Sequence, residues 1–490
     1  MATIISDGEQ FVGGAEDDTV LIWANDVVAD GRGGDDWLST RLFYETAAGI
    51  SLSTELIGGA GNDFLKSAMG LAGAPEDYEI PLSMSATFEG GAGNDGIWAD
   101  FSSAYADRFV SADGGDGDDR ITVTDSFVYN GNNEPQPHRA ESAVRGGTGD
   151  DVISIELIDN FGLDPLANSG RGAKSTVHGM DGADRITSSV GSGSGEAAEN
   201  FLYGGDGDDE IGATAGTGAD WGGGPAYNRA RGGDGDDRIE MEAASDSGTV
   251  TNSATGDAGN DTISVVGSTS WGSGYSDISG DAGDDRLTAR INTGNEYLDD
   301  FAWTAVNTIE GGDGDDRITG IVSIEGPIVD TDDFFSDLYG GAGDDIITAR
   351  GGFDNILAGN QGDDTLRGSG STDRLIGGQG ADVLRGGGGE DEFVFKGTRG
   401  EASERDRVAD FSQGEDRFDL SAIDANVSRG GNQAFTFDGG TGTGRAWVEE
   451  APNGNGSLLY ANNGRGTLVV ALSDGRGMDA SDYEAGDFLL

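Results

Sequence analysis

GGDGDDRIT, residues 311–319, sets a pattern that most of the chain repeats. It places glycine at 311, 312 and 314, an aspartate at 316 and a bulky apolar residue at 318. The same frame recurs with aspartates at Asp18, Asp36, Asp63, Asp95, Asp119, Asp151, Asp184, Asp209, Asp237, Asp261, Asp285, Asp316, Asp345, Asp364, Asp382 and Asp391. Repetition on this scale is typical of a solenoid, so we expect stacked coils rather than one globular core.

The residue types in this frame suit a divalent cation. Calcium prefers six to eight oxygen ligands from carboxylates and backbone carbonyls. Glycine reaches positive φ, so its carbonyl can turn toward an ion, while the aspartate supplies charge. An apolar residue two places after the aspartate would point into the coil, as at Ile121, Ile153, Ile186, Ile211, Ile239, Ile263 and Leu287. A flexible Gly/Asp linker has no use for that fixed apolar position, so calcium turns are the favoured interpretation.

The frame resembles the RTX nonapeptide repeat, GGxGxDxUx, in which U is a bulky apolar residue. The resemblance covers roughly residues 11 to 395. It implies an all-β fold, a parallel β-roll or β-solenoid in which each glycine turn binds Ca²⁺ and each x-U-x tail forms a strand. It also implies that multiple Ca²⁺ ions are the cofactor and that the sixteen aspartates named above are metal ligands.

Composition excludes several classes of partner. The 490-residue chain carries a formal net charge of −61, contains 89 glycines and has no cysteine. Such a charge would be repelled by a nucleic-acid backbone and by anionic membranes. No apolar run approaches the roughly 20 residues of a transmembrane helix, so we expect no membrane insertion. Without counter-ions the folded roll would repel itself, so we expect folding to require calcium.

Repeat spacing predicts three regions. Residues 1–340 form a long-coil roll with one nonapeptide per coil, calcium turns along one edge and long insertions on the other. Residues 341–395 form a regular roll with turns on both edges, including degenerate turns that end at Asp354 and Asp373. Residues 396–490 form a β-rich C-terminal cap. In most coils Asn or Ser replaces the second acid, at Ser142, Ser175, Asn200, Asn228, Asn252, Ser276, Asn307, Ser336 and Asn355.

The C-terminal region carries a second resemblance. Residues 408–421 (VADFSQGEDRFDLS) and the final Asp487-Phe488-Leu489-Leu490 are similar to the end of serralysin-type secreted proteases. This implies a type I (ABC-transporter) secretion signal, that machinery as a partner during export, and a secreted, extracellular or cell-surface location. The N-terminus MATIISDGEQ has no Sec-type features. The alternative interpretation is a cap over the end of the stack, and both can hold.

The sequence favours a structural extracellular role over catalysis. The only histidines are His138 and His178, and the zinc motif HExxH, the G-x-S-x-G elbow and the Walker A loop are absent. The repeats begin by Gly13, with no catalytic domain ahead of them. We therefore expect a non-enzymatic matrix, surface-layer or filament protein that self-associates.

Two alternatives stay open. One is a non-catalytic polysaccharide-binding module that uses aromatic residues in the insertions. These are Phe43, Tyr44, Trp98, Tyr105, Phe127, Tyr129, Trp221, Tyr227, Trp271, Tyr275, Tyr297, Trp303, Phe334 and Phe335. The same aromatics could instead pack the insertions onto the roll or join copies of the protein. The weaker alternative is an enzyme that acts on extracellular polymers.

Overall fold

The computed structural model describes residues 3–5, 10–44, 51–71, 82–103, 106–126, 139–159, 172–192, 196–217, 223–294, 303–325, 334–397, 405–452, 456–473 and 478–490. They form two compact units, residues 1–258 with 262–274 and residues 259–261 with 275–490. Each unit is described by itself. In the described parts of both, no helix has the length and apolar character needed to cross a membrane.

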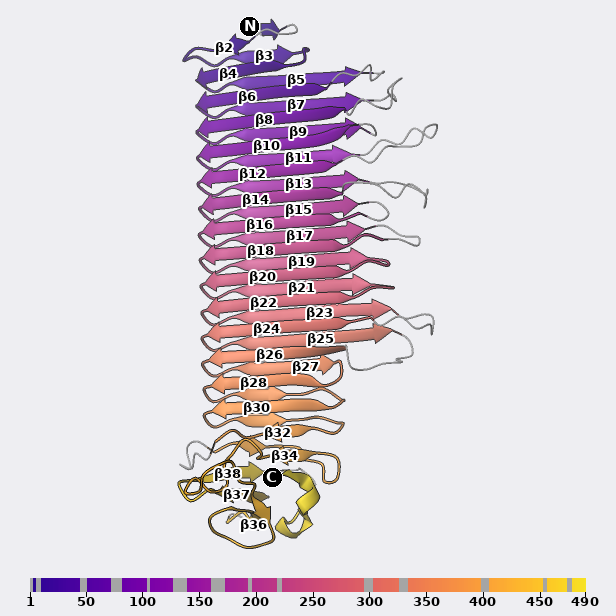
Figure 1. Ribbon diagram of the computed structural model, residues 1–490. Coiled ribbons are helices and arrows are strands. Elements are labelled where there is room, and N and C mark those ends of the chain that lie inside the picture. Colours follow the sequence, from indigo (N-terminus) through magenta and orange to yellow (C-terminus); the bar gives the residue numbers. More distant parts are fainter. Residues whose placement is uncertain are drawn as a thin grey trace. The chain divides into compact units, whose positions relative to one another are not determined.

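The first unit contains two parallel sheets whose strands alternate along the chain (Figure 1). Odd-numbered strands form one sheet: β1 (Thr3–Ile5), β3 (Thr19–Ile22), β5 (Trp37–Tyr44), β7 (Phe64–Leu71), β9 (Gly96–Ser103), β11 (Arg120–Ser126), β13 (Val152–Asp159), β15 (Arg185–Ser192), β17 (Glu210–Thr217), β19 (Arg238–Ser245) and β21 (Thr262–Thr269). Even-numbered strands form the other: β2 (Phe11–Val12), β4 (Val27–Gly33), β6 (Leu52–Ala60), β8 (Ser83–Ala92), β10 (Asp107–Asp116), β12 (Ala140–Thr148), β14 (Ala173–Asp181), β16 (Ala198–Asp206), β18 (Ala226–Asp234) and β20 (Val250–Ala258).

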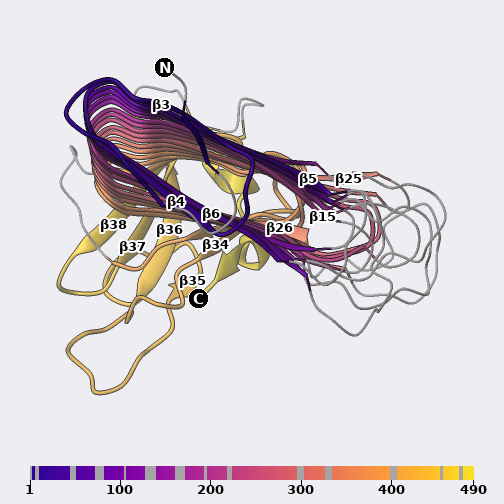
Figure 2. The same cartoon turned by 90° about the horizontal axis from the view of Figure 1, so that it is seen from above.

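Each strand pairs in parallel with the strand two places further on, so one coil consists of an even and an odd strand. In Figure 2 the strands of the first unit, drawn in indigo to magenta, form two layers joined by tight turns at one edge. The glycine–aspartate frames make these turns, which lead from even to odd strands. The connections from odd to even strands leave from the other edge, and many of them lie outside the described residues.

The core lies between the two sheets because side chains alternate in and out along each strand. In β17, Ile211, Ala213 and Ala215 are buried, while their neighbours face outward. Pairing places like residues in columns, so Ile186, Ile211 and Ile239 stack across β15, β17 and β19. The prediction that the apolar residue after each aspartate points inward is confirmed, since these side chains are buried. Together with the parallel pairing, this confirms the predicted all-β parallel roll.

The second unit has the same two-sheet construction. Its even strands are β22 (Gly274–Ala282), β24 (Ala305–Asp313), β26 (Phe334–Ala342), β28 (Asn355–Gln361), β30 (Asp373–Gln379), β32 (Glu392–Val394) and β34 (Arg417–Asp419). Its odd strands are β23 (Arg286–Gly294), β25 (Arg317–Glu325), β27 (Ile346–Gly351), β29 (Thr365–Arg367), β31 (Val383–Arg385) and β33 (Arg407–Val408). The parallel ladders therefore continue past residue 395, and the proposed three-region division stays a prediction.

The C-terminal part of this unit contains the predicted strands. They are β35 (Thr436–Phe437), β36 (Arg445–Glu450), β37 (Ser457–Asn462) and β38 (Thr467–Leu472), followed by two 3₁₀ turns (Ala480–Asp482 and Ala485–Asp487) and β39 (Phe488–Leu489). β36, β37 and β38 pair antiparallel. Phe488 is buried, with its ring 5.4 Å from Phe418 and 4.3 Å from Phe437. In the folded chain Phe488 therefore belongs to the core of this region, whereas Leu489 is exposed.

Candidate calcium site

One repeat shows how the turn is made. Gly204 to Asp209 connects β16 to β17, and Gly205 and Gly207 have φ of 134° and 127°. Residues other than glycine rarely adopt positive φ values of this size. A Cβ at Gly205 would also lie 1.8 Å from the carbonyl oxygen of Met180 in the preceding coil. Glycine is therefore required both for the backbone conformation and for the close approach of neighbouring coils.

The turn aspartates form a ladder of hydrogen bonds from coil to coil. The backbone N–H of Asp184 donates to Oδ1 of Asp209 at 2.8 Å, and the N–H of Asp209 donates to Oδ1 of Asp237 at 2.8 Å. The same bond repeats from Asp18 to Asp237 in the first unit and from Asp261 to Asp382 in the second. Each ladder carboxylate thus uses one oxygen to hold the turn of the preceding coil.

The second carboxylate oxygen, Oδ2, is buried and has no hydrogen-bond partner within the described residues. This holds for Asp36, Asp63, Asp95, Asp119, Asp151, Asp184, Asp209, Asp285, Asp316, Asp345, Asp364 and Asp382. A Cβ built on Gly204 would lie 2.0 Å from Oδ2 of Asp209 and 2.6 Å from the carbonyl oxygen of Gly232. The opening glycine therefore leaves space where a carboxylate oxygen and a carbonyl oxygen of the next coil converge.

These oxygens fit calcium. A buried carboxylate oxygen without a partner is costly unless a cation lies beside it. In the described part of the chain, no three His, Cys, Asp or Glu side chains converge into a metal cluster. Each turn would therefore combine a carboxylate with backbone carbonyls, a hard all-oxygen set of the kind calcium takes. When bound, the ion would supply the positive charge that the ladder lacks.

Burial also changes the acidity of the ladder. Loss of solvation raises the pKa to about 6 at Asp63, Asp119, Asp184 and Asp316. It raises the pKa to about 7 at Asp95, Asp151, Asp209, Asp285 and Asp345 and to about 8 at Asp364. The ladder N–H lowers each pKa but does not offset the loss of water. Without a cation, part of the ladder would be protonated near neutral pH.

Comparison with protein families agrees with this geometry. The model for the RTX calcium-binding nonapeptide repeat (4 copies) matches residues 54–68, 192–220, 305–320, 336–356 and 358–393. The chain therefore contains RTX calcium-binding repeats. RTX nonapeptides are calcium-binding motifs, so multiple Ca²⁺ ions are its cofactor. Comparison with curated proteins gives no match. The resemblance of the C-terminal region to serralysin-type proteins stays a prediction, since the matched residues end at 393.

Within the second RTX unit, the predicted ligands separate onto two edges. Asp345, Asp364 and Asp382 follow even strands, whereas Asp391 lies between β31 and β32 on the opposite edge. There Asp373 donates its N–H to Oδ1 of Asp391 at 3.0 Å. Burial, followed by the charge of Asp416, raises the pKa of Asp391 to about 8. The second ladder supports the prediction of turns on both edges in this region.

The degenerate turn predicted to end at Asp354 is shifted by one residue. Asp354 is exposed and belongs to neither ladder. Its neighbour Asn355, which the row of Asn and Ser residues predicted, takes the inward position, and its Oδ1 accepts the N–H of Ser336 at 2.8 Å. The spacing between acids points to Asp354, whereas counting back from Gly359 points to Asn355. Since alternate side chains in a strand face opposite sides, a shift of one residue exchanges inside for outside.

Two ladder residues were missed by the sequence analysis. Asp382 donates its N–H to Oδ1 of Asp406 at 3.1 Å, and Asp391 donates its N–H to Oδ1 of Asp416 at 3.0 Å. Asp416 had a signal, because Gly414 and Phe418 keep the third glycine and the apolar position of the repeat. Asp406 has no glycine turn before it, so only its place in the ladder identifies it.

We call the edge with the glycine–aspartate turns the turn edge, and the edge from which odd strands connect to even strands the loop edge. In the first unit, the loop edge has amide side chains where the turn edge has carboxylates. Asn200 and Asn228 are buried at the positions where Asn was predicted to replace the acid. The Nδ2 of Asn200 donates to the carbonyl of Thr214 at 2.9 Å and to Oδ1 of Asn228 at 2.8 Å. The Nδ2 of Asn228 donates in turn to the carbonyl of Glu242 at 2.7 Å and to Asn252 at 3.0 Å. This neutral ladder needs no cation.

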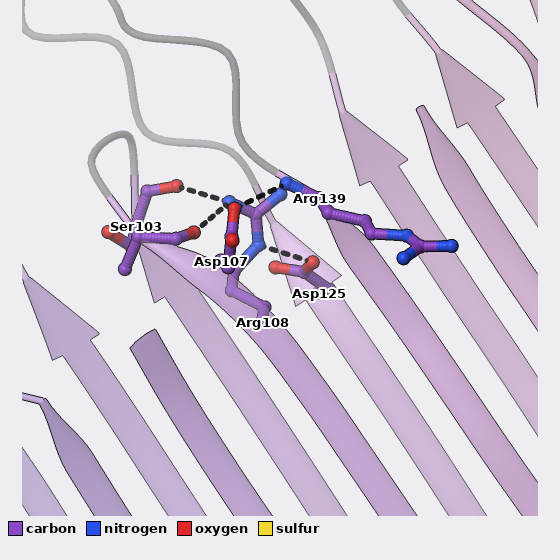
Figure 3. Close-up of polar contacts among 6 residues, drawn as sticks. Ser103, Asp107, Arg108, Asp125 and Arg139 are labelled. Atoms are coloured by element: carbon purple, nitrogen blue, oxygen red, sulfur yellow. Dashed lines mark hydrogen bonds and ion pairs between the residues drawn. The ribbon is translucent and has the colours of Figure 1, made fainter. Parts of the chain in front are cut away.

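A single coil of the first unit contains a buried ion pair at the loop edge (Figure 3). Arg108 of β10 and Asp125 of β11 are 1% and 2% exposed, and Nε of Arg108 lies 2.6 Å from Oδ2 of Asp125. Nη1 of Arg108 also donates to the carbonyls of Ser103 and Ala106 at 3.2 and 3.0 Å. Burial raises the pKa of Asp125, while the arginine lowers it. Here an arginine provides the charge that neutralises an inward carboxylate.

The aromatic residues assigned to insertions need correction. Tyr105, Phe127, Tyr129, Trp221 and Tyr297 lie outside the described residues. Most of the others lie on strands: Phe43 and Tyr44 on β5, Trp98 on β9, Tyr227 on β18, Tyr275 on β22, and Phe334 and Phe335 on β26. Phe334 is buried in a core cluster that Trp303 contacts, as the packing interpretation requires. Phe43, Trp98, Trp271 and Tyr275 are exposed.

Proposed function

We propose that this RTX protein is secreted and has a structural role outside the cell, as a matrix, surface-layer or filament component whose calcium-dependent fold is its function. The observation that carries the proposal is the ladder of buried carboxylate oxygens without partners. Such a ladder runs through both units and makes the fold depend on a cation that is scarce in the cytosol. The sixteen predicted aspartates, with Asp406 and Asp416, are the proposed ligands.

Export through a type I machinery is consistent with this arrangement. RTX repeats are typical of proteins secreted by that route. Before calcium binds, repulsion within a chain of net charge −61 favours an unfolded, threadable state. Because Phe488 is buried in the folded state, a C-terminal signal would be accessible only while this region is unfolded. Calcium outside the cell would then drive folding and prevent return.

Self-association is the second part of the proposal. Stacked parallel strands can extend by the same backbone hydrogen bonds that join their coils. Bound calcium would reduce the charge that otherwise keeps copies apart. We also propose that the protein is non-catalytic. His178 supports this in part, since it stacks on Tyr203 with 4.5 Å between ring centroids, and burial lowers its pKa.

Sedimentation velocity in EGTA and then in millimolar calcium tests the proposal. We expect a slow, expanded monomer in EGTA and large, regular assemblies in calcium, which electron microscopy would show as filaments or layers. A compact monomer in calcium at all protein concentrations would contradict self-assembly while leaving calcium binding intact. Magnesium at equal concentration is the control, because it prefers a smaller octahedral site and keeps its water.

A further inference from the structure

The outer face of the odd-numbered strands in the first unit carries a patch of exposed aromatic rings. Trp37 and Trp98 are 49% and 42% exposed, and Phe64 lies 4.4 Å from Trp37 between ring centroids. These three residues, the aromatic platform, come from β5, β7 and β9. Exposed rings grouped on one face of a highly charged protein indicate a binding surface rather than a core.

Neighbouring residues hold the rings of the platform in place. A Cβ at Gly96 would lie 3.0 Å from the ring of Phe64, so this ring covers a glycine of the next strand. Lys66 lies over Trp98, with Nζ 4.7 Å from the ring centroid, and fixes that ring in place.

A groove lies further along the same face. It has a volume of about 600 Å³ and is lined by residues of β13, β15, β17, β19 and β21. Its floor follows one outward row in which Ser154, Thr187, Gly212, Glu240 and Ser264 are register partners. Three hydroxyls and one carboxylate therefore line this row, with an open position at the glycine. These groups can donate hydrogen bonds to, and accept them from, a ligand rich in hydroxyls.

The platform and the groove share one row of the sheet. Trp98 is the register partner of Thr122, and Thr122 is the register partner of Ser154 at the start of the groove. From β9 to β21 this row crosses six strand steps, about 29 Å at roughly 4.8 Å per step. A ligand that contacts both must be extended and must run across the strands. This direction excludes β-strand addition, which requires a free strand edge.

We propose that this face binds a neutral, linear polysaccharide. The C–H faces of sugar rings stack on aromatic rings, and their hydroxyls match the Ser, Thr and Glu side chains of the groove. The net charge of −61 and the carboxylates at Glu156, Glu240 and Glu242 would repel a polyanion. Trp98 is one of the aromatic residues that the sequence assigned to insertions, but it lies on a strand. The site would supply the matrix contact that self-assembly alone does not provide.

Two glycines of β17 offer a matched pair of variants. Gly212 lies in the groove, and a Cβ there would make only ordinary contacts, the nearest 3.6 Å from Thr187. Gly216 faces outward on the same strand but outside the groove, with nothing within 4 Å of its Cβ position. Gly212→Gln should therefore fill the groove without straining the backbone, and Gly216→Gln should leave it open. Trp98→Ala removes the ring of the aromatic platform that lies in the same row of the sheet as the groove.

Affinity electrophoresis and titration calorimetry of the calcium-loaded full chain would test the proposal, with hydroxyethyl cellulose and galactomannan as neutral probes and alginate as the polyanion. We expect binding to a neutral probe, weakened about tenfold or more by Gly212→Gln or Trp98→Ala and unchanged by Gly216→Gln. Melting curves would confirm that each variant folds.

Three results would overturn the proposal. They are no binding to either neutral probe, stronger binding to alginate, or equal losses from the two glycine variants. If Trp98→Ala changes only sedimentation in calcium, the platform joins copies of the chain and the glycan proposal is wrong. Failure here leaves the self-assembly test unaffected, because that test contains no polysaccharide.

Discussion

The loop edge of the first unit and the corresponding edge of residues 341–393 place different polar side chains at the same inward position, and these side chains find their hydrogen-bond partners in different ways. In the first unit Asn200 and Asn228 donate to carbonyls of the facing strands and to the next amide, so the row satisfies itself. In the second unit Asp373 and Asp391 occupy this position. Asp373 accepts the side-chain amide of Asn355, and Asp391 accepts the backbone N–H of Asp373. A carboxylate cannot donate. One change of side chain, amide to carboxylate, therefore gives this edge a negative charge that a cation can balance.

The difference also accounts for where the insertions lie. Calcium turns require glycines at positive φ and a fixed approach of neighbouring coils, as at Gly205 and Gly207. An insertion at that edge would separate the oxygens that share an ion. The amide ladder is formed by residues within the strands, so it does not depend on the segments that connect odd strands to even strands. Long segments between odd and even strands can then be accommodated without loss of the ladder.

The largest expected effect comes from the coil in which arginine replaces the cation. Arg108→Met would leave Asp125 buried without its partner and should lower the free energy of unfolding by about 3–5 kcal/mol. Chemical denaturation in saturating calcium would measure the loss. The double variant Arg108→Met/Asp125→Leu should recover most of it, because no charge then remains buried. A double variant as unstable as the single one would show that packing, not charge, is what the pair provides.

The amide ladder can be broken directly. Asn228→Asp replaces a donor with a carboxylate that faces the carbonyl of Glu242, so we expect a loss of about 3 kcal/mol at neutral pH. Asn228→Ser should cost less, since serine occupies this row at Ser175 and Ser276. Hydrogen exchange of β18 and β20 would locate the effect. Equal stability of the Asp and Asn forms in EGTA would contradict the distinction between the two edges.

The turn edge should respond through calcium. Asp209→Asn keeps an acceptor for the N–H of Asp184 but removes the buried charge, so about one or two fewer ions should bind per chain, at a cost of roughly 1–2 kcal/mol. Asp208→Asn is the matched control, because Asp208 is the exposed neighbour with the same charge. Calcium counted by metal analysis after gel filtration would separate them. Equal losses would mean that overall charge, not the ladder, determines binding.

The smallest effect concerns pH. The ladder carboxylates have pKa values raised from 3.8 to about 6–8 in the ion-free fold, as at Asp95, Asp316 and Asp364. That fold therefore binds more protons than the unfolded chain between about pH 4 and pH 8, and its stability falls as pH rises through this window. In EGTA, acidification from pH 8 to pH 5 should increase the β signal in circular dichroism. Calcium added at about pH 5, where the ion-free fold is populated and its ladder protonated, should release protons, measurable by calorimetry in two buffers, and no release would contradict the raised pKa values.

The sequence was sufficient for the roll because its signals are local and repeated. Each turn carries its own glycines and aspartate, and Ile211 or Ile239 marks the inward side two residues later. Where the repeat is degenerate, only the register between coils identifies the inward residue, which is why the sequence left both Asp354 and Asn355 as candidates and missed Asp406. Long-range contacts such as Arg108 with Asp125, and the shared row of Trp98 and Ser154, depend on strand pairing that no local pattern contains.

The central claim is that buried ladder carboxylates make folding depend on calcium. Far-UV circular dichroism with a thermal melt, in EGTA and in millimolar calcium at pH 7.5, tests it most directly. We predict the spectrum of an unfolded chain in EGTA and, on adding calcium, a β spectrum that melts cooperatively. A β spectrum and a cooperative melt in EGTA equal to those in calcium would contradict the claim, because the ladder would then be stable without the ion.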